Sequence, residues 1–145
     1  MDIHCNKDNI IPLLVDKLID KGIKPTPQRL AVYEYVWQHQ NHPDAATIRD
    51  ALIDRFPTLS LTTIYSTLKS LTEVDLLREV NIDPVNIRYD IAECCEHGHF
   101  RCAKCGRIID FPLPPRADIP LLHSMKVTGY DIYVSGVCDQ CLVSD

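Results

Sequence analysis

The chain has 145 residues, of which 46 % are hydrophobic and 24 % charged, which is typical of a globular protein rather than a disordered one. No apolar run approaches the roughly 20 residues of a membrane-spanning helix, and the polar start MDIHCNKDN does not resemble a signal peptide. We therefore expect a cytoplasmic protein without a membrane partner, whose seven cysteines stay reduced. The net charge of −5 argues mildly against nucleic acid as a partner, so DNA binding would need a local basic surface.

Apolar residues at helical spacing predict four helices in the first half of the chain. The first covers 10–21 and ends before Gly22. The second begins at Pro27 behind Thr26 as N-cap, and its apolar face holds Leu30, Tyr33, Val36 and Trp37. The third covers about 44–55, with apolar residues Ala45, Ile48 and Leu52. The fourth runs over 60–72 with Ser60 as N-cap, and we expect it to bury Leu61, Ile64, Leu68 and Leu71.

Two short strands are predicted at 76–80 and 86–91, around the turn residues Asp83 and Pro84. Three helices or more followed by such a hairpin are typical of the winged helix-turn-helix. The fourth helix would expose a polar face next to Tyr65, made of Thr62, Thr63, Ser66, Thr67 and Lys69. Such a face suits a DNA groove, although a surface helix of another α-helical domain remains an alternative.

The second half predicts strands at 107–111 and 130–137, separated by a Pro-rich stretch at 112–115 and a short helix at 120–127. This small unit has too few residues for a large core, so a bound metal and a partner subunit are both expected. The fold class is therefore α+β. We expect a winged helix-turn-helix domain over 1–83, a hinge over 84–92, and a small α/β dimerisation domain with a four-cysteine zinc site over 93–145.

Two C-x-x-C pairs, Cys102 with Cys105 and Cys138 with Cys141, predict a structural zinc site. Each pair supplies two thiolates at the angle that tetrahedral Zn²⁺ requires, and the closed shell leaves no position open for catalysis. Redox dithiols are the alternative, but they do not explain two pairs at strand ends in a domain with little core.

Histidines and aspartates form a second group of candidate ligands. His97 and His99 point to the same side if this segment is a strand, and Asp90 and Asp110 lie near the ends of neighbouring strands. His42 lies at the start of the third helix. Imidazole and carboxylate donors suit Fe²⁺, Mn²⁺ or Zn²⁺, but each residue taken singly is more often an ordinary surface residue. These residues alone leave a second metal site open.

Several motifs together resemble the ferric uptake regulator (Fur) superfamily over nearly the whole chain. They are GIKPTPQR (22–29), NHP (41–43), SLTTIYSTL (60–68), RYD (88–90), HGHFRCAKCG (97–106), IIDF (108–111) and VTGY…GVCDQC (127–141). The resemblance implies a homodimeric winged-helix repressor that binds double-stranded operator DNA when a regulatory metal is bound. It implies neither an enzyme nor a small-molecule substrate.

The resemblance also implies site residues. The family's regulatory ligands match His42, Asp90, His97, His99 and Asp110, which would hold Fe²⁺ or Mn²⁺. Both carboxylates are aspartates, as in the peroxide-sensing (PerR) branch, whereas the iron-sensing branch usually has glutamates. In the peroxide-sensing branch, Fe²⁺ and peroxide oxidise a ligand histidine, and the matching residues are His42 and His97.

For DNA, Lys24 matches a minor-groove residue and Tyr65 one that contacts thymine methyls, while Arg29 and Lys69 would contact phosphates. Ser66 and Thr67 stand where relatives often have two asparagines, and Asp75 stands where a glycine commonly ends the helix. The Cys94-Cys95 pair before His97 leaves a thiol ligand or redox step open.

Three other functions stay open. An iron- or manganese-responsive regulator without peroxide sensing is the first alternative within the family. A catalytic mononuclear iron site would need open coordination positions, and five protein ligands leave little room for them. A zinc-ribbon adaptor that binds only protein would not need the polar face of the fourth helix.

Overall fold

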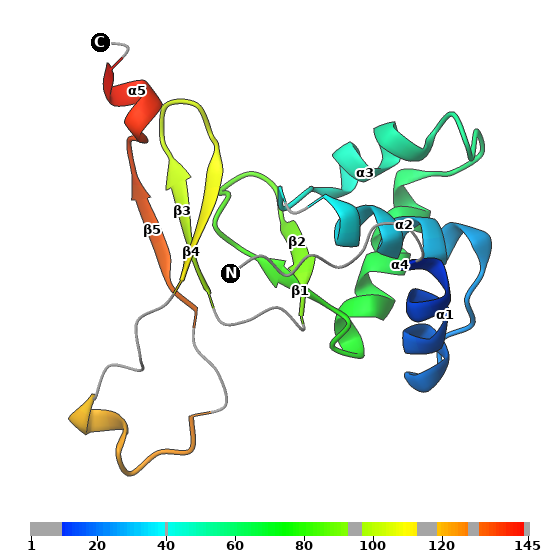
Figure 1. Ribbon diagram of the computed structural model, residues 1–145, viewed down its shortest axis with the longest axis horizontal. Coiled ribbons are helices and arrows are strands. Elements are labelled where there is room, and N and C mark those ends of the chain that lie inside the picture. The colour runs from blue at the N-terminus through cyan, green and yellow to red at the C-terminus, as the bar shows by residue number, and fades with distance from the viewer. Residues whose placement is uncertain (1–9, 40, 93–96, 113–118, 128–130, 144–145) are drawn as a thin grey trace. The chain divides into compact units, whose positions relative to one another are not determined.

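A computed structural model describes residues 10–39, 41–92, 97–112, 119–127 and 131–143. The chain divides into two compact units between residues 93 and 94 (Figure 1). The first unit contains four helices and a hairpin: α1 (Ile10–Asp20), α2 (Pro27–Gln38), α3 (Ala45–Leu52), α4 (Leu61–Glu73), β1 (Leu77–Val80) and β2 (Arg88–Ile91). The helices followed by a hairpin form the predicted winged helix-turn-helix, so this part of the fold class is confirmed.

Side-chain caps set the starts of three helices. Thr26 accepts a hydrogen bond from the Arg29 amide, and Ser60 accepts one from the Thr63 amide, as the sequence predicts. Asp44 caps α3 in the same way. Each cap satisfies one of the backbone N–H groups that a helix start leaves without a partner, a contribution of about 1 kcal/mol.

The core of the first unit lies between the helices. Its fully buried side chains include Leu14, Leu18, Val32, Tyr33, Ile48, Ile64, Leu68 and Leu71. Trp37 and Leu30, which we expected on the buried face of α2, are half-exposed, because Ala31 and Val32 occupy the buried positions. Leu61 is likewise half-exposed at the first turn of α4. The helix predicted over 44–55 ends at Leu52 and continues as a turn.

Two helices end with a residue in the left-handed conformation. Gly22 (φ 74°) follows α1, where the Ile23 amide donates to the Leu18 carbonyl. Asp75 (φ 59°) follows α4 in the same way, with the Leu76 amide donating to the Leu71 carbonyl. Aspartate has a steric cost there that glycine does not, so the end of α4 is strained.

The hairpin pairs β1 and β2 in antiparallel register, with Arg78 opposite Asp90 and Leu77 opposite Ile91. The strand β2 lies within residues 84–92, where the sequence predicts a hinge, and it belongs to the first unit. Leu77, Val80, Tyr89 and Ile91 are buried, so the hairpin is packed into the core of this unit. Burial raises the pKa of Tyr89 to about 12.

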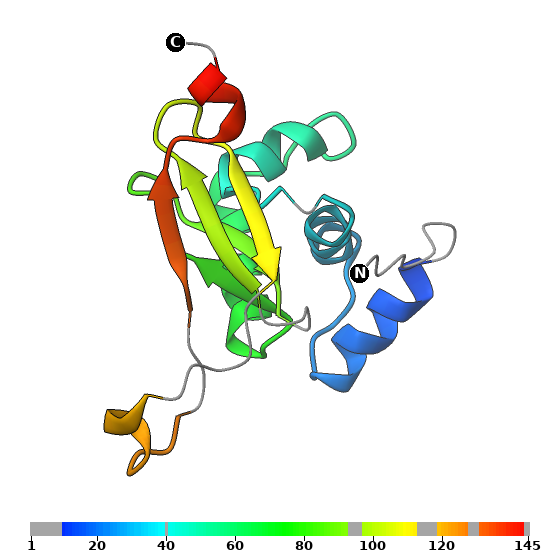
Figure 2. The same cartoon turned by 60° about the vertical axis from the view of Figure 1, so that its left-hand side comes forward.

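The second unit is a small sheet with short flanking elements: β3 (His97–Cys102), β4 (Ile108–Pro112), a 3-10 turn (Pro120–Leu122), β5 (Tyr133–Gly136) and α5 (Asp139–Val143). The strand β3 lies between β4, which is antiparallel to it, and β5, which is parallel (Figure 2). The helix predicted over 120–127 is reduced to the 3-10 turn, because none of its residues is buried and so short a helix needs packing to persist. The sequence did not predict α5.

Gly98 in β3 is required by its neighbour across the sheet. It pairs with Phe111 of β4, and a Cβ atom at position 98 would overlap the Phe111 ring. The phenyl ring therefore covers one face of β3, and His97 and His99, on either side of Gly98, point to the opposite face.

Candidate metal centres and DNA-binding surface

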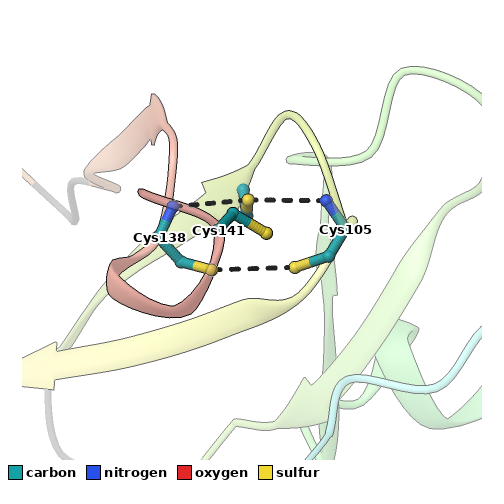
Figure 3. Close-up of side chains that lie close together, drawn as sticks. Cys105, Cys138 and Cys141 are labelled. Atoms are coloured by element: carbon teal, nitrogen blue, oxygen red, sulfur yellow. Dashed lines mark hydrogen bonds between the residues drawn. The ribbon is translucent and has the colours of Figure 1, made fainter. Parts of the chain in front are cut away.

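The four cysteines of the two C-x-x-C pairs come together in the second unit. Cys102 ends β3, Cys105 lies in the following turn, and Cys138 and Cys141 flank the start of α5. The sulfurs of all four lie within 4.8 Å of one another, and Cys105 Sγ is 3.8 Å from Cys138 Sγ (Figure 3). Tetrahedral Zn²⁺ with bonds of about 2.3 Å requires sulfurs about 3.8 Å apart. The donor type and spacing therefore fit Zn²⁺.

The turn after β3 prepares Cys102 to be a thiolate. Its sulfur accepts hydrogen bonds from the backbone N–H groups of Cys105 (3.5 Å) and Cys138 (3.3 Å). These bonds stabilise the anion and lower the pKa of Cys102 to about 6. Gly106 (φ 74°) closes the turn by donating its N–H to the Cys102 carbonyl.

An ion pair joins the two cysteine loops. Arg107, just before β4, donates from Nη2 to Oδ1 of Asp139, which lies between Cys138 and Cys141, at 2.9 Å. The Asp139 side chain is 84 % exposed and that of Arg107 is 39 % exposed, so this ion pair adds little to the stability of the fold. The Arg107 guanidinium lies beside the four cysteines, which as thiolates would carry a net negative charge even with Zn²⁺ bound.

Three predicted regulatory residues meet on one face of the same sheet. His99 and Asp110 are direct partners across β3 and β4, and Nδ1 of His99 lies 2.7 Å from Oδ1 of Asp110. His97 Nε2 lies 3.5 Å from Oδ2 of the same carboxylate, and the two imidazole rings are 4.7 Å apart. His99 is 2 % exposed. Two imidazoles and a carboxylate within 4.8 Å of one another fit a divalent first-row metal ion.

Tyr133 completes this row of side chains. It is the partner of His99 in β5, and the two rings stack with centroids 5.9 Å apart and planes 27° apart. His99 is therefore held between a carboxylate on one neighbouring strand and an aromatic ring on the other. Sequence reasoning missed Tyr133, because the parallel pairing of β3 with β5 leaves no local pattern in the sequence.

The other two predicted regulatory residues meet in the first unit. His42 precedes α3 and has φ 52°, a strained conformation that histidine tolerates better than most residues. Asp90 is in β2, and its Oδ1 lies 3.8 Å from Nδ1 of His42. Both are buried, with exposed fractions of 1 % and 4 %. Cys94 and Cys95 lie outside the described residues.

Three of the six residues predicted to contact DNA lie on the outer face of α4. Tyr65 is 49 % exposed, Ser66 is exposed, and Lys69 projects into solvent near Glu73. Lys24 is exposed before α2, and its carbonyl accepts a hydrogen bond from Arg29 Nη1 at 3.1 Å. A polar groove joins the start of α2 to α4, lined by Thr26, Gln28, Arg29, Thr62, Thr63, Ser66 and Thr67.

Thr67 requires a correction. We expected it on the exposed face of α4, but it is buried, with 6 % of its surface exposed. It stands three residues after Ile64 and four before Leu71, so helical geometry places it on the core side. We no longer assign Thr67 a contact with DNA bases.

Comparison with known proteins decides the family. The sequence model of the ferric uptake regulator family matches residues 20–132. The chain belongs to this family. Fur-family proteins are transcription regulators rather than enzymes, and this chain is a metal-responsive regulator of that kind.

None of the described helices has the length and apolar character required to span a membrane.

Similar proteins include regulators named for peroxide. The chain is 32 % identical to the peroxide operon regulator of Bacillus subtilis over 131 residues, which are 88 % of this chain and 90 % of that one. It is 33 % identical to the peroxide-responsive repressor PerR of Staphylococcus epidermidis, over 83 % of this chain and 82 % of that one.

Solved structures agree with the fold. The PerR structure from Streptococcus pyogenes, described as a basis for peroxide sensing and gene regulation, has a TM-score of 0.53 at 28 % identity, covering 97 % of this chain and 99 % of that one. The Helicobacter pylori ferric uptake regulator has a TM-score of 0.74 at 21 % identity, over 98 % and 97 % of the two chains. The second of these supports the fold alone.

Proposed function

We propose that this Fur-family protein is a peroxide-sensing repressor that binds operator DNA as a homodimer in the cytoplasm. The observation that carries the proposal is the group formed by His97, His99 and Asp110 on one face of the second unit's sheet. An aspartate rather than a glutamate at position 110, together with relatives of 32–33 % identity named for peroxide response, favours peroxide over iron as the signal.

Structural Zn²⁺ is proposed at Cys102, Cys105, Cys138 and Cys141, since their sulfur spacing fits a tetrahedral thiolate site. Few described residues of the second unit are buried, so the metal would replace part of a hydrophobic core. Exposed apolar side chains of this unit favour a second copy of the chain as its partner: Ile109, Ile119, Leu121, Met125, Val127 and Val134.

A regulatory Fe²⁺ or Mn²⁺ is proposed to bind residues from both units of the chain: His42 and Asp90 from the first, and His97, His99 and Asp110 from the second. The support is the donor chemistry of each group and its match to the family's ligand pattern. Binding that requires both groups favours the conformation in which they can share one ion, and so fixes how the DNA-binding units are presented.

The peroxide response is proposed to act through the ligand histidines. Bound Fe²⁺ would supply the redox chemistry for a net reaction in which hydrogen peroxide gives one oxygen atom to the ring of His42 or His97 and leaves as water. An oxidised imidazole is a poorer donor, so metal affinity falls and the DNA-binding conformation is lost. Mn²⁺ would support DNA binding without this chemistry.

Metal-dependent DNA contact is proposed for the α4 face and the start of α2. On α4, Tyr65 and Ser66 would face bases and Lys69 a phosphate, while Lys24 would face the minor groove and Arg29 a phosphate. The test is metal analysis and footprinting of the purified protein. We expect one Zn²⁺ per chain plus one exchangeable Fe²⁺ or Mn²⁺, and a footprint that disappears when a mild chelator removes the exchangeable ion. A footprint of equal strength without that ion would contradict the proposal. Mn²⁺- or Fe²⁺-dependent footprints that are both insensitive to peroxide would favour a regulator of metal uptake instead.

A further inference from the structure

The carboxylate of Asp90 is held by a residue of the opposite wing strand. Arg78 in β1 is the direct partner of Asp90 in β2, and Arg78 Nη2 donates a hydrogen bond to Asp90 Oδ2 at 3.1 Å. The Asp90 side chain is 6 % exposed and that of Arg78 is 28 % exposed. A partly buried, charge-assisted contact of this kind orients its partners far better than a surface ion pair does.

The two oxygens of Asp90 have different surroundings. Oδ2 faces Arg78, whereas Oδ1 accepts the Ile91 amide at 2.8 Å and lies 3.8 Å from Nδ1 of His42. Arg78 and the Ile91 amide, one on each oxygen, together fix the rotation of the carboxylate about its side-chain bond. That rotation leaves Oδ1 on the side of the other first-unit residue proposed as a ligand.

We propose that Arg78 is a positioning residue for the regulatory metal, and that it acts through Asp90. This inference rests on the proposed function, because it requires Asp90 to bind the metal. Carboxylate ligands depend on hydrogen bonds from surrounding residues to hold the orientation that a metal needs. A guanidinium is suited to this because its donors are planar and rigid.

Two effects of Arg78 on metal binding oppose each other. Its positive charge repels a divalent cation, while its hydrogen bond orients the ligand oxygen. Without Arg78, Oδ2 of the largely buried Asp90 carboxylate would lose this donor, and the side chain would no longer be held in its present orientation. The orienting effect therefore exceeds the repulsion, and loss of Arg78 weakens metal binding.

The same hairpin also fastens the other first-unit residue. Arg88 in β2 donates from Nη1 to the His42 carbonyl at 3.2 Å, and the Tyr89 amide donates to the Pro43 carbonyl at 3.1 Å. Both first-unit ligand candidates are thus attached to the wing hairpin.

Because linkage is reciprocal, metal binding should stabilise the hairpin. We expect slower amide hydrogen exchange in β1 and β2 of the parent protein with Mn²⁺, and a smaller slowing in R78M.

The test measures Mn²⁺ affinity from the electron paramagnetic resonance signal of free Mn²⁺, using the zinc-containing dimer. The variants are R78M, R78K, D90A and the double variant R78M/D90A. The control is R55M, which removes an arginine of the same unit whose side chain is 63 % exposed. We expect R78M to weaken Mn²⁺ binding by about 10- to 100-fold, R78K to weaken it less, and R55M to match the parent. In the D90A background, R78M should cause no further loss.

The outcomes separate this inference from the proposed function. If D90A binds Mn²⁺ as tightly as the parent, Asp90 is not a ligand and both fail. If D90A weakens binding but R78M or R78K matches the parent or binds more tightly, only the role of Arg78 is contradicted. A further loss from R78M in the D90A background also contradicts it, because Arg78 would then act by another route. Should R78M not fold by circular dichroism, R78K decides the result.

Discussion

The imidazole Nδ1 of His99 and the carboxylate Oδ1 of Asp110 lie 2.7 Å apart across the β3–β4 register. This contact places the shortest acidic side chain directly opposite a buried histidine in the centre of a three-stranded sheet. Glutamate at position 110 would extend the carboxylate by one methylene. His99 Nδ1 already lies at hydrogen-bonding distance from the aspartate, so the longer side chain would have to move its carboxylate. The identity of residue 110 therefore controls the geometry of any ion held by His97 and His99.

Asp110→Glu should separate metal binding from peroxide sensing. The charge is kept, so the variant still binds a divalent metal and still shows metal-dependent operator binding. The altered reach changes the coordination that peroxide meets, so most of the peroxide response is lost. Asp110→Ala should lose both properties. Operator binding by the Fe²⁺ forms with and without peroxide checks this, and a D110E variant with the parent's full peroxide response would contradict it.

Cys102→Ser or Cys138→Ser should remove one Zn²⁺ per chain and dissociate or unfold the dimer, because metal binding and folding of this small unit are coupled. Zinc analysis together with analytical ultracentrifugation measures both effects. Cys5→Ser, a change outside the C-x-x-C pairs, is the control and should keep zinc and dimer. A stable dimer of C102S without zinc would rule out the thiolate site.

On the DNA-binding surface, Lys69→Ala should weaken binding to all sequences and reduce the slope of log affinity against log salt by about one unit. Tyr65→Ala should relax base preference instead. Thr67→Val should leave operator affinity close to that of the parent, because Thr67 belongs to the core side of α4. Filter binding over a range of salt concentrations and operator variants distinguishes the three. A large loss of affinity in T67V with unchanged stability would restore Thr67 as a DNA contact.

Asp75→Gly should remove a steric cost of about 1 kcal/mol from the folded first unit. The extra freedom that glycine gives the unfolded chain opposes this gain, so the net stabilisation is smaller. The reason is the φ of 59° at Asp75, which glycine adopts without steric cost. Thermal unfolding followed by circular dichroism measures the change. Gly22→Asp, the reverse change at the matching end of α1, should destabilise the protein. An unchanged or lower melting temperature in D75G would show that the Asp75 side chain offsets the strain.

Local sequence signals predicted the features that depend on a few neighbouring residues. The caps Thr26 and Ser60 satisfy their own helix starts, so their chemistry is visible within four residues. The C-x-x-C pairs carry zinc-type spacing in the same way, and the structure brings all four cysteines together.

Features that depend on tertiary packing could not be predicted in this way. The burial of Thr67 follows from which side of α4 meets the other helices, and a threonine gives no apolar signal. The neighbour of His99 in β5, Tyr133, is more than thirty positions away in the chain. The short helix α5 has too few residues to show a helical period in the sequence, and it begins inside the second cysteine pair, between Cys138 and Cys141.

The most direct test of the central claim uses the Fe²⁺-loaded protein bound to operator DNA and exposed to a small excess of hydrogen peroxide. Operator release and the masses of peptides containing His42, His97 and the Cys94-Cys95 pair are measured in the same samples. We predict that release rises in step with a gain of 16 Da on His42 or His97, and that the Mn²⁺ form shows neither. Release with both histidines unmodified and Cys94-Cys95 oxidised would contradict the account and identify the thiol pair as the sensor.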